Sequence, residues 1–222
     1  MCFSAGASLT AGVLLTFIGV ETLKKVHKPA QLIFASIPLF FAIQQFAEGI
    51  LWLTIAREGY QGVRTAATYM FIIMAQILWP VMIPLSVLLL EKNSIRKKIL
   101  YVMAFMGCAV GIYDAYLLIA HGIYAEVSSR HLTYQSGFQD DLGWTALILY
   151  LAVTVLPLFI SGVKRMYILG IIMAVSFAVS AVFYMQCLTS VWCFFAAVIS
   201  FVVFYIIRDA HRQMDFSSEK KK

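Results

Sequence analysis

Residues 44–52 read QQFAEGILW and place a carboxylate and two amides inside a segment that is otherwise apolar enough to span a bilayer. From residue 31 to residue 56 the only ionisable side chain is that of Glu48. A carboxylate at membrane depth costs about 2.5–3.5 kcal/mol on insertion scales, which makes Glu48 a candidate functional residue. On a helix, Gln44 and Gln45 lie one turn before Glu48 and Trp52 lies one turn after it. The stretch therefore predicts a membrane helix with one polar wall, which either lines a binding pocket or joins helices by hydrogen bonds.

The composition excludes an ordinary soluble domain. Of the 222 residues 62% are hydrophobic and the mean hydropathy is +0.86, whereas apolar usage in soluble domains is near half. Apolar runs of about 20 residues are typical of transmembrane helices rather than barrel strands. The net charge of +6 comes from short clusters between these runs, as the positive-inside rule expects, so the expected partner is the lipid bilayer and not nucleic acid.

The apolar runs predict an all-α, polytopic integral membrane protein that forms one domain over residues 1–222 and has no soluble module. The first run lacks the basic n-region of a signal peptide and is followed by lysines, so we expect it to be retained with the N-terminus outside. Seven transmembrane helices are expected, at residues 3–20, 32–56, 66–90, 99–120, 144–163, 166–186 and 188–207.

The distribution of basic residues supports this count. Fourteen of the 17 lysines and arginines fall on one set of alternate loops and on the C-terminal tail. The other set holds only Arg57, Arg64 and Arg130. Seven helices with a cytoplasmic C-terminus satisfy the positive-inside rule, and an even number would place basic clusters on both sides.

This orientation gathers the polar residues toward the outside. The run at 99–120 carries Gly107, Gly111, Asp114 and His121 at helical spacing, which predicts a small-residue packing seam that leads to a carboxylate and an imidazole. The loop at 122–143 has no evident element and is either a cap for the pocket or a solvated linker. Pro80 and Pro84 predict a kink or freed carbonyls in the third span.

Several chemistries fit these residues. A solute or a relayed proton needs only hydrogen-bonding groups, for which the candidates are Gln44, Gln45, Glu48, Trp52, Asp114, His121 and Trp192. Zinc or copper would take thiolate, imidazole and carboxylate ligands, although no ligand-spacing signature is present; the candidates are Cys2, Glu48, His121, His131 and Cys193. Two of the outer cysteines could pair in an oxidising compartment, or all could be packing residues.

Known seven-helix chemistries fit less well. The last span contains no lysine, so a retinal Schiff base has no anchor there. Alkaline-ceramidase-type hydrolases need more histidines than the outer side offers, and the Pro-Gln dipeptide of the sugar and amino-acid transporters with that loop motif does not occur.

Several short motifs are distributed over the whole chain: MCFSA at residues 1–5, Ser8, PLF at 38–40, QQ at 44–45, EG at 48–49, Trp52, and SVWCFFAA at 190–197. In these motifs the chain resembles a bacterial family of multi-pass proteins of unknown function. The resemblance implies a multi-pass protein of the bacterial inner membrane. It also implies that the motif residues belong together, namely Cys2, Ser4, Gln45, Glu48, Trp52, Trp192 and Cys193.

These observations favour binding or transport of a small solute or ion in an outward-facing polar pocket. The alternative is a membrane-embedded enzyme or metal-binding protein that uses Cys2, Glu48 or His121. A structural or assembly partner is the third reading, in which Glu48 serves packing alone.

Overall fold

The computed structural model describes residues 4–128, 131–136, 143–184 and 195–219, and these are mostly helical. Two helical elements, η1 and η2, are short segments of 3-10 and π geometry. In chain order the elements are α1 (Ala5–Leu23), η1 (Pro29–Gln31), α2 (Leu32–Ala35), α3 (Ile37–Thr54), α4 (Gln61–Ile72), η2 (Ile73–Leu78), α5 (Trp79–Leu90), α6 (Ser94–His121), β1 (Ile123–Ser128), β2 (His131–Ser136), α7 (Gly143–Ile160), α8 (Met166–Tyr184) and α10 (Ala196–Glu219).

Among the described residues, five helical stretches are long and apolar enough to cross a membrane. They are Ala5–Leu23, Pro29–Thr54, Gln61–Leu90, Ser94–His121 and Met166–Phe183. The second comprises η1, α2 and α3, and the third comprises α4, η2 and α5. A shorter apolar helix covers Thr145–Ile160, within the span expected at 144–163. The break expected between the last two spans lies outside the described residues.

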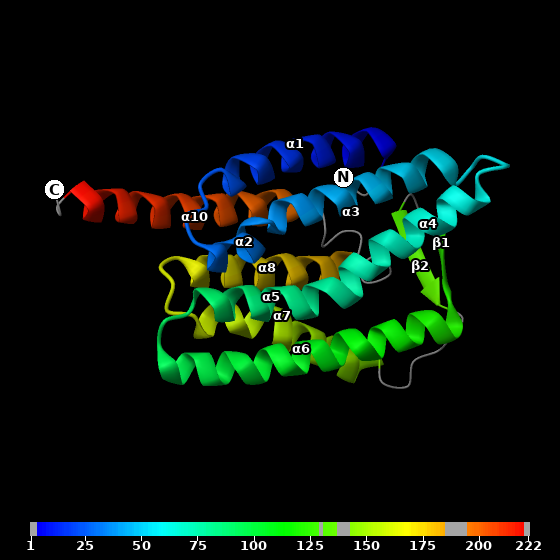
Figure 1. Cartoon of the computed structure of the whole chain (residues 1–222). Helices are drawn as coiled ribbons and strands as arrows, with labels where there is room; N and C mark the ends of the chain where they lie inside the picture. Colours follow the sequence, from blue (N-terminus) through cyan, green and yellow to red (C-terminus); the bar gives the residue numbers. More distant parts are fainter. Residues whose placement is uncertain (1–3, 129–130, 137–142, 185–194, 220–222) are drawn as a thin grey trace.

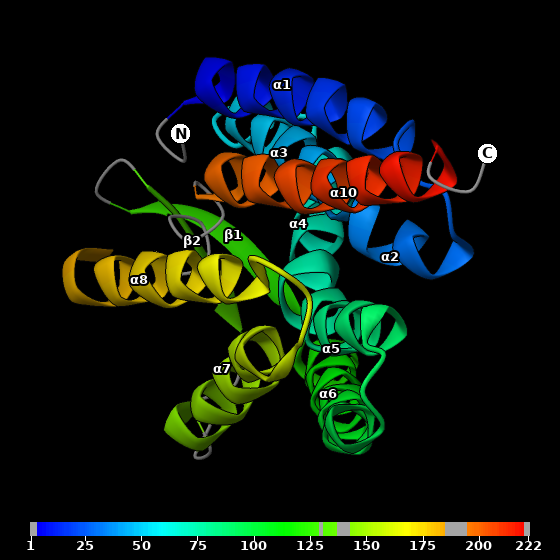
Figure 2. The same ribbon diagram turned by 90° about the vertical axis from the view of Figure 1, so that its left-hand side faces the viewer.

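The loops sort to the two ends of the bundle (Figure 1). The turns at 24–28, 91–93 and 161–165 lie at the same end as the C-terminus, and the turn at 55–60 and the hairpin lie at the other. Viewed along its length, the molecule has α1, α3 and α10 side by side, with α5 stacked on α6 and with α7 and α8 completing the bundle (Figure 2).

Helices α1 and α3 pack closely because glycines on each receive bulky side chains from the other. A Cβ built on Gly12 would lie 2.8 Å from the ring of Phe46, and one on Gly49 would lie 2.6 Å from Leu9. This close approach brings the polar residues of α3 within reach of α1.

The third apolar stretch contains six residues of π-helix, η2, which ends at Leu78, two residues before Pro80. In π geometry the carbonyl of Ala75 would accept from the N–H of residue 80, which proline lacks. The hydroxyl of Tyr150 on α7 donates to that carbonyl at 2.6 Å instead. The freed carbonyl expected from the prolines is therefore present and is satisfied by another helix.

Glycines on α6 let that helix approach the same irregular segment. A Cβ on Gly107 would overlap the carbonyl oxygen of Pro80, and one on Gly111 would lie 3.0 Å from the carbonyl oxygen of Ile77. The two-glycine seam expected on this helix thus packs on the backbone of α5 and η2.

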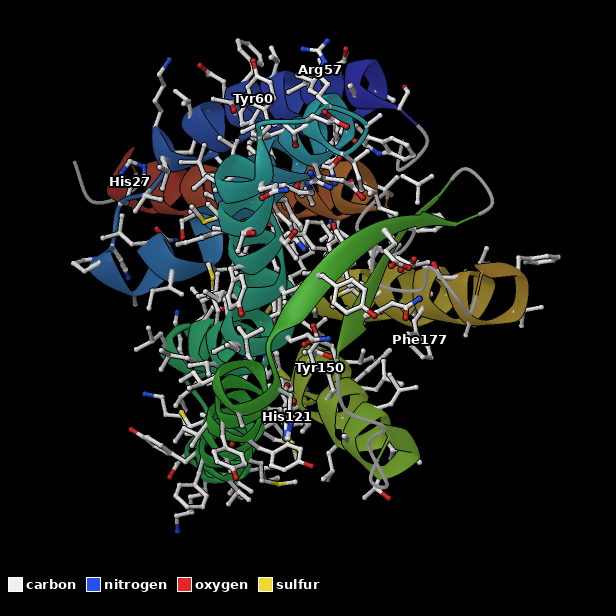
Figure 3. The ribbon with its side chains drawn as sticks, turned by 90° about the vertical axis from the view of Figure 1, so that its right-hand side faces the viewer. His27, Arg57, Tyr60, His121, Tyr150 and Phe177 are labelled. Carbon is white, nitrogen blue, oxygen red and sulfur yellow. The ribbon has the colours of Figure 1, made fainter. Side chains whose placement is uncertain are left out.

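The loop at residues 122–143 was expected to have no element of its own. It instead contains an antiparallel hairpin of β1 and β2. Side chains that alternate along the strands pack on the bundle: Ala125 and Leu132 join a buried cluster with Leu51 and Ala67. Figure 3 shows the hairpin crossing the end of the bundle beside α4.

Candidate functional site

Glu48 lies in the protein interior at the interface of α1 and α3. Its side chain is 0% exposed, and the Ser8 hydroxyl donates to Glu48 Oε2 at 3.4 Å. A carboxyl group buried between helices needs hydrogen-bonding partners, and the Ser8 hydroxyl of α1 is one of them. Glu48 and its neighbours on α3, namely Gln44, Gln45 and Trp52, are called the α3 polar cluster below.

Gln44 joins α3 to α5. The indole Nε1 of Trp79 donates to Gln44 Oε1 at 3.1 Å, and both side chains are buried. The ring of Phe41 lies against that of Trp79 with centroids 4.2 Å apart. This part of the cluster has a packing role.

Gln45 differs from Gln44 in its surroundings. Its side chain is 1% exposed, and neither the amide nitrogen nor the amide oxygen has a hydrogen-bond partner among the described residues. The indole Nε1 of Trp52 is likewise buried without a partner. Because native interiors satisfy most buried polar groups, these two side chains are where the cluster has unused hydrogen-bonding capacity.

The two α6 candidates lie apart from the α3 polar cluster. Asp114 is half-buried and His121 is exposed, and neither side chain is free of interactions. α6 packs against α5, η2 and α7, so the third apolar stretch lies between it and α3 (Figures 1 and 2).

The remaining candidates concern metal binding and the closing motif. Cys2, Trp192 and Cys193 lie outside the described residues, and His131 is the first residue of β2. Within the described part of the chain, no group of three or more His, Cys, Asp or Glu side chains is placed to hold a metal ion. Cys108 is a free thiol on an exposed face of α6.

An apolar cavity of about 40 Å³ lies beside the Gln44 and Trp79 pair. Its wall includes the rings of Phe41, Trp79 and Tyr150 and the hydroxyl-bearing Thr154. The cavity is enclosed mainly by hydrocarbon, so it does not supply the polar pocket expected around Glu48.

Glu91 is a buried carboxylate that sequence reasoning missed. Its Oε2 accepts the N–H of Gly162 at 2.6 Å, and its Oε1 accepts those of Lys92 and Asn93 at 2.9 Å each. Burial raises the pKa of this carboxyl, but the three backbone hydrogen bonds and nearby Arg96 outweigh burial and hold the pKa below its ordinary value. Glu91 therefore ties the α5–α6 turn to the α7–α8 turn.

These features define a class: a helical protein with helices long and apolar enough to cross a membrane and with polar side chains buried between them. The chain belongs to the family of unknown function DUF6629, whose family model matches residues 1–218. This confirms the resemblance to a family of unknown function that extends over the chain. Comparisons with curated proteins and with solved structures found no match.

Proposed function

We propose that this chain is a bacterial inner-membrane protein of seven spanning helices, with its N-terminus outside, that binds or transports a small polar solute or ion at the α3 polar cluster. Large apolar side chains on outward faces support membrane insertion; Phe105 is 76% exposed and Ile119 is 85% exposed. Faces of this kind suit contact with lipid rather than with water.

The orientation has a direct test. Reporter fusions that are active only in the cytoplasm should be active after Lys98 and silent after Arg130. The reverse pattern would contradict the proposed orientation.

The observation that carries the binding proposal is the buried amide of Gln45, which has no hydrogen-bond partner in the described part of the chain. Leaving a buried amide without hydrogen bonds costs about 1–3 kcal/mol. An apolar side chain would fill the same space without this cost, so an amide at this position favours a role in binding. A solute or ion with both donor and acceptor contacts would satisfy Gln45 and the Trp52 indole, and Glu48 on the same wall would add a carboxyl group.

A pair of buried glutamines provides the experiment. Gln31 accepts the backbone N–H groups of His27 and Lys28 at 3.0 and 3.2 Å, so its amide has a structural role. We expect Gln45→Leu to raise the thermal midpoint of the purified protein, because it removes an unsatisfied amide. Gln31→Leu should lower the midpoint, because it leaves two backbone donors without their acceptor.

Solute binding is then measured as a rise in the thermal midpoint with a defined panel: sodium, potassium, methylammonium, glycerol and glucose. Gln45→Leu should abolish the response that the parent protein gives. Glu48→Gln should be at least as stable as the parent, since it keeps size and hydrogen-bonding capacity without a charge to bury, and its response should fall.

A purely structural cluster would behave differently. In that case Gln45→Leu would lower the midpoint as Gln31→Leu does, and no member of the panel would stabilise the parent. A marked loss of stability in Glu48→Gln would instead indicate an ionised Glu48 paired with a buried cation.

A further inference from the structure

A polar hollow lies between α4 and strand β1. Figure 3 shows these two elements beside each other at the hairpin end of the bundle. Its volume is about 340 Å³, and small-molecule sites commonly have about 300–1,000 Å³. Residues one helical turn apart form the α4 wall, and the strand forms the other; the lining residues are Gln61, Arg64, Thr65, Thr68, Ile123, Tyr124, Ala125 and Glu126.

Arg64 brings a positive charge to this hollow. Its Nε is buried and has no hydrogen-bond partner in the described part of the chain, and its Nη1 makes only a 3.4 Å contact with the carbonyl oxygen of Ile55. Neither of the two ion pairs formed among the described residues includes it. A guanidinium stays charged and presents a planar fork of donors that matches a carboxylate or phosphate, so Arg64 has unused capacity for an anion.

Glu126 lines the same hollow from the strand. Its side chain is exposed, and among the described residues it forms an ion pair neither with Arg64 nor with any other cation. Two opposite charges therefore border one open space without neutralising each other. A simple anion would be repelled by Glu126 and a simple cation by Arg64, whereas a molecule with both charges would be attracted by both walls.

We propose that this hollow binds a small zwitterion, with a carboxylate or phosphate group on Arg64 and a primary ammonium group on Glu126. Free amino acids and the headgroup of phosphatidylethanolamine share this chemistry. The site uses α4 and β1 rather than the α3 polar cluster, so it stands or falls independently of the function proposed above.

The free-ligand arm titrates the full chain, purified in detergent, with L-alanine by isothermal calorimetry. Arg64→Gln and Glu126→Gln should each weaken binding by about tenfold to a hundredfold, the range expected for one charge-assisted hydrogen bond. Arg57→Gln and Glu58→Gln are the matched controls, because both residues are exposed near the start of α4 and lie outside the hollow. Both controls should keep the parental affinity.

The lipid arm uses vesicles with equal amounts of phosphatidylethanolamine and phosphatidylcholine, and native mass spectrometry of the extracted protein. Phosphatidylcholine carries the same phosphate, but its quaternary ammonium has no N–H group to donate to Glu126. If the source is lipid, the parent retains phosphatidylethanolamine in preference, both hollow variants lose that preference, and L-alanine gives no binding heat. If the source is a free amino acid, L-alanine binds and the lipid preference is absent.

The proposal is overturned if neither probe binds, if Arg64→Gln and Glu126→Gln match their controls, or if acetate binds as tightly as L-alanine. Thermal unfolding of each variant checks that the fold is retained. If Arg64→Gln does not fold, the test uses Arg64→Lys and Glu126→Gln instead. Arg64→Lys keeps the positive charge but lacks the planar fork of donors, and Glu126→Gln changes an exposed position.

Discussion

Substitution of Glu91 tests whether one carboxylate holds two turns of the bundle together. Glu91 is 5% exposed, and its two oxygens accept three backbone N–H groups from both turns. Glu91→Gln keeps the oxygen that faces Lys92 and Asn93 but turns an NH₂ group toward the N–H of Gly162, so it removes one charge-assisted bond.

The magnitude follows from that bond. Hydrogen bonds to charged groups contribute about 1.5–3 kcal/mol, and because Gly162 is itself exposed, water can replace part of the loss. We expect Glu91→Gln to lower the free energy of unfolding by about 1–2 kcal/mol, and Glu91→Ala, which removes all three bonds, by about 2–4 kcal/mol. For a chain of this size the glutamine variant should lose about 2–8 °C in thermal midpoint.

The pH dependence gives an independent check. The folded protein holds the pKa of Glu91 below its ordinary value, so the unfolded chain binds the proton more readily than the folded one. The stabilisation is therefore fully present above the ordinary pKa and disappears as the pH falls through the lowered folded pKa. The difference in midpoint between parent and Glu91→Gln, measured in one detergent, should be constant near neutral pH and shrink in acid.

Two results would refute this reasoning: equal midpoints for parent and Glu91→Gln at neutral pH, or a difference that grows as the pH falls. Glu21→Gln is the control, because Glu21 forms a largely exposed ion pair with Lys24 and should leave the midpoint unchanged.

Two further substitutions test the packing around the irregular third stretch, each by the thermal midpoint in detergent. Gly107→Ala should lower the free energy of unfolding by about 1–3 kcal/mol, because its Cβ would overlap the Pro80 carbonyl. Gly62→Ala on α4 is the control and should leave the stability unchanged, because there is open space around Gly62. Equal effects of the two substitutions would contradict the close approach of α5 and α6. Tyr150→Phe should cost about 1–3 kcal/mol because it leaves the Ala75 carbonyl without its donor, and the exposed Tyr167→Phe should be neutral; a neutral Tyr150→Phe would show that the π segment satisfies that carbonyl in another way.

The helices could be predicted because hydropathy is a property of consecutive residues. Apolar runs of membrane length fix where helices lie regardless of what packs on them, and helical spacing alone puts Gln45, Glu48 and Trp52 on one side of α3. Helix ends depend on capping as well as on hydropathy. α6 begins at Ser94, before the apolar run expected at 99–120, because Asn93 caps it through the backbone N–H groups of Ile95 and Arg96.

Part of the hairpin could have been predicted from the sequence, but residues 122–143 were interpreted as one long loop. Residues 131–135 alternate polar residues with Leu132 and Tyr134, which is typical of a strand with one packed face. The role of Glu91 had no comparable signal, since its partner Gly162 lies 71 residues away in the sequence. Contacts of that kind depend on how helices are rotated and paired, which local patterns do not encode.

Gln31 and Gln45 show the same difference between local contacts and contacts that depend on helix packing. Gln31 bonds to backbone groups three and four residues before it, so a reader who finds it just after Pro29 can infer a local capping role. Gln45 lies in the middle of α3, and whether its amide is satisfied depends on every helix that surrounds it. Sequence reasoning can nominate a buried polar residue, but only the arrangement of the helices separates one that completes the fold from one that retains unused donors and acceptors. For this reason the search for a ligand begins at Gln45 rather than at the equally buried Gln31 or Gln44.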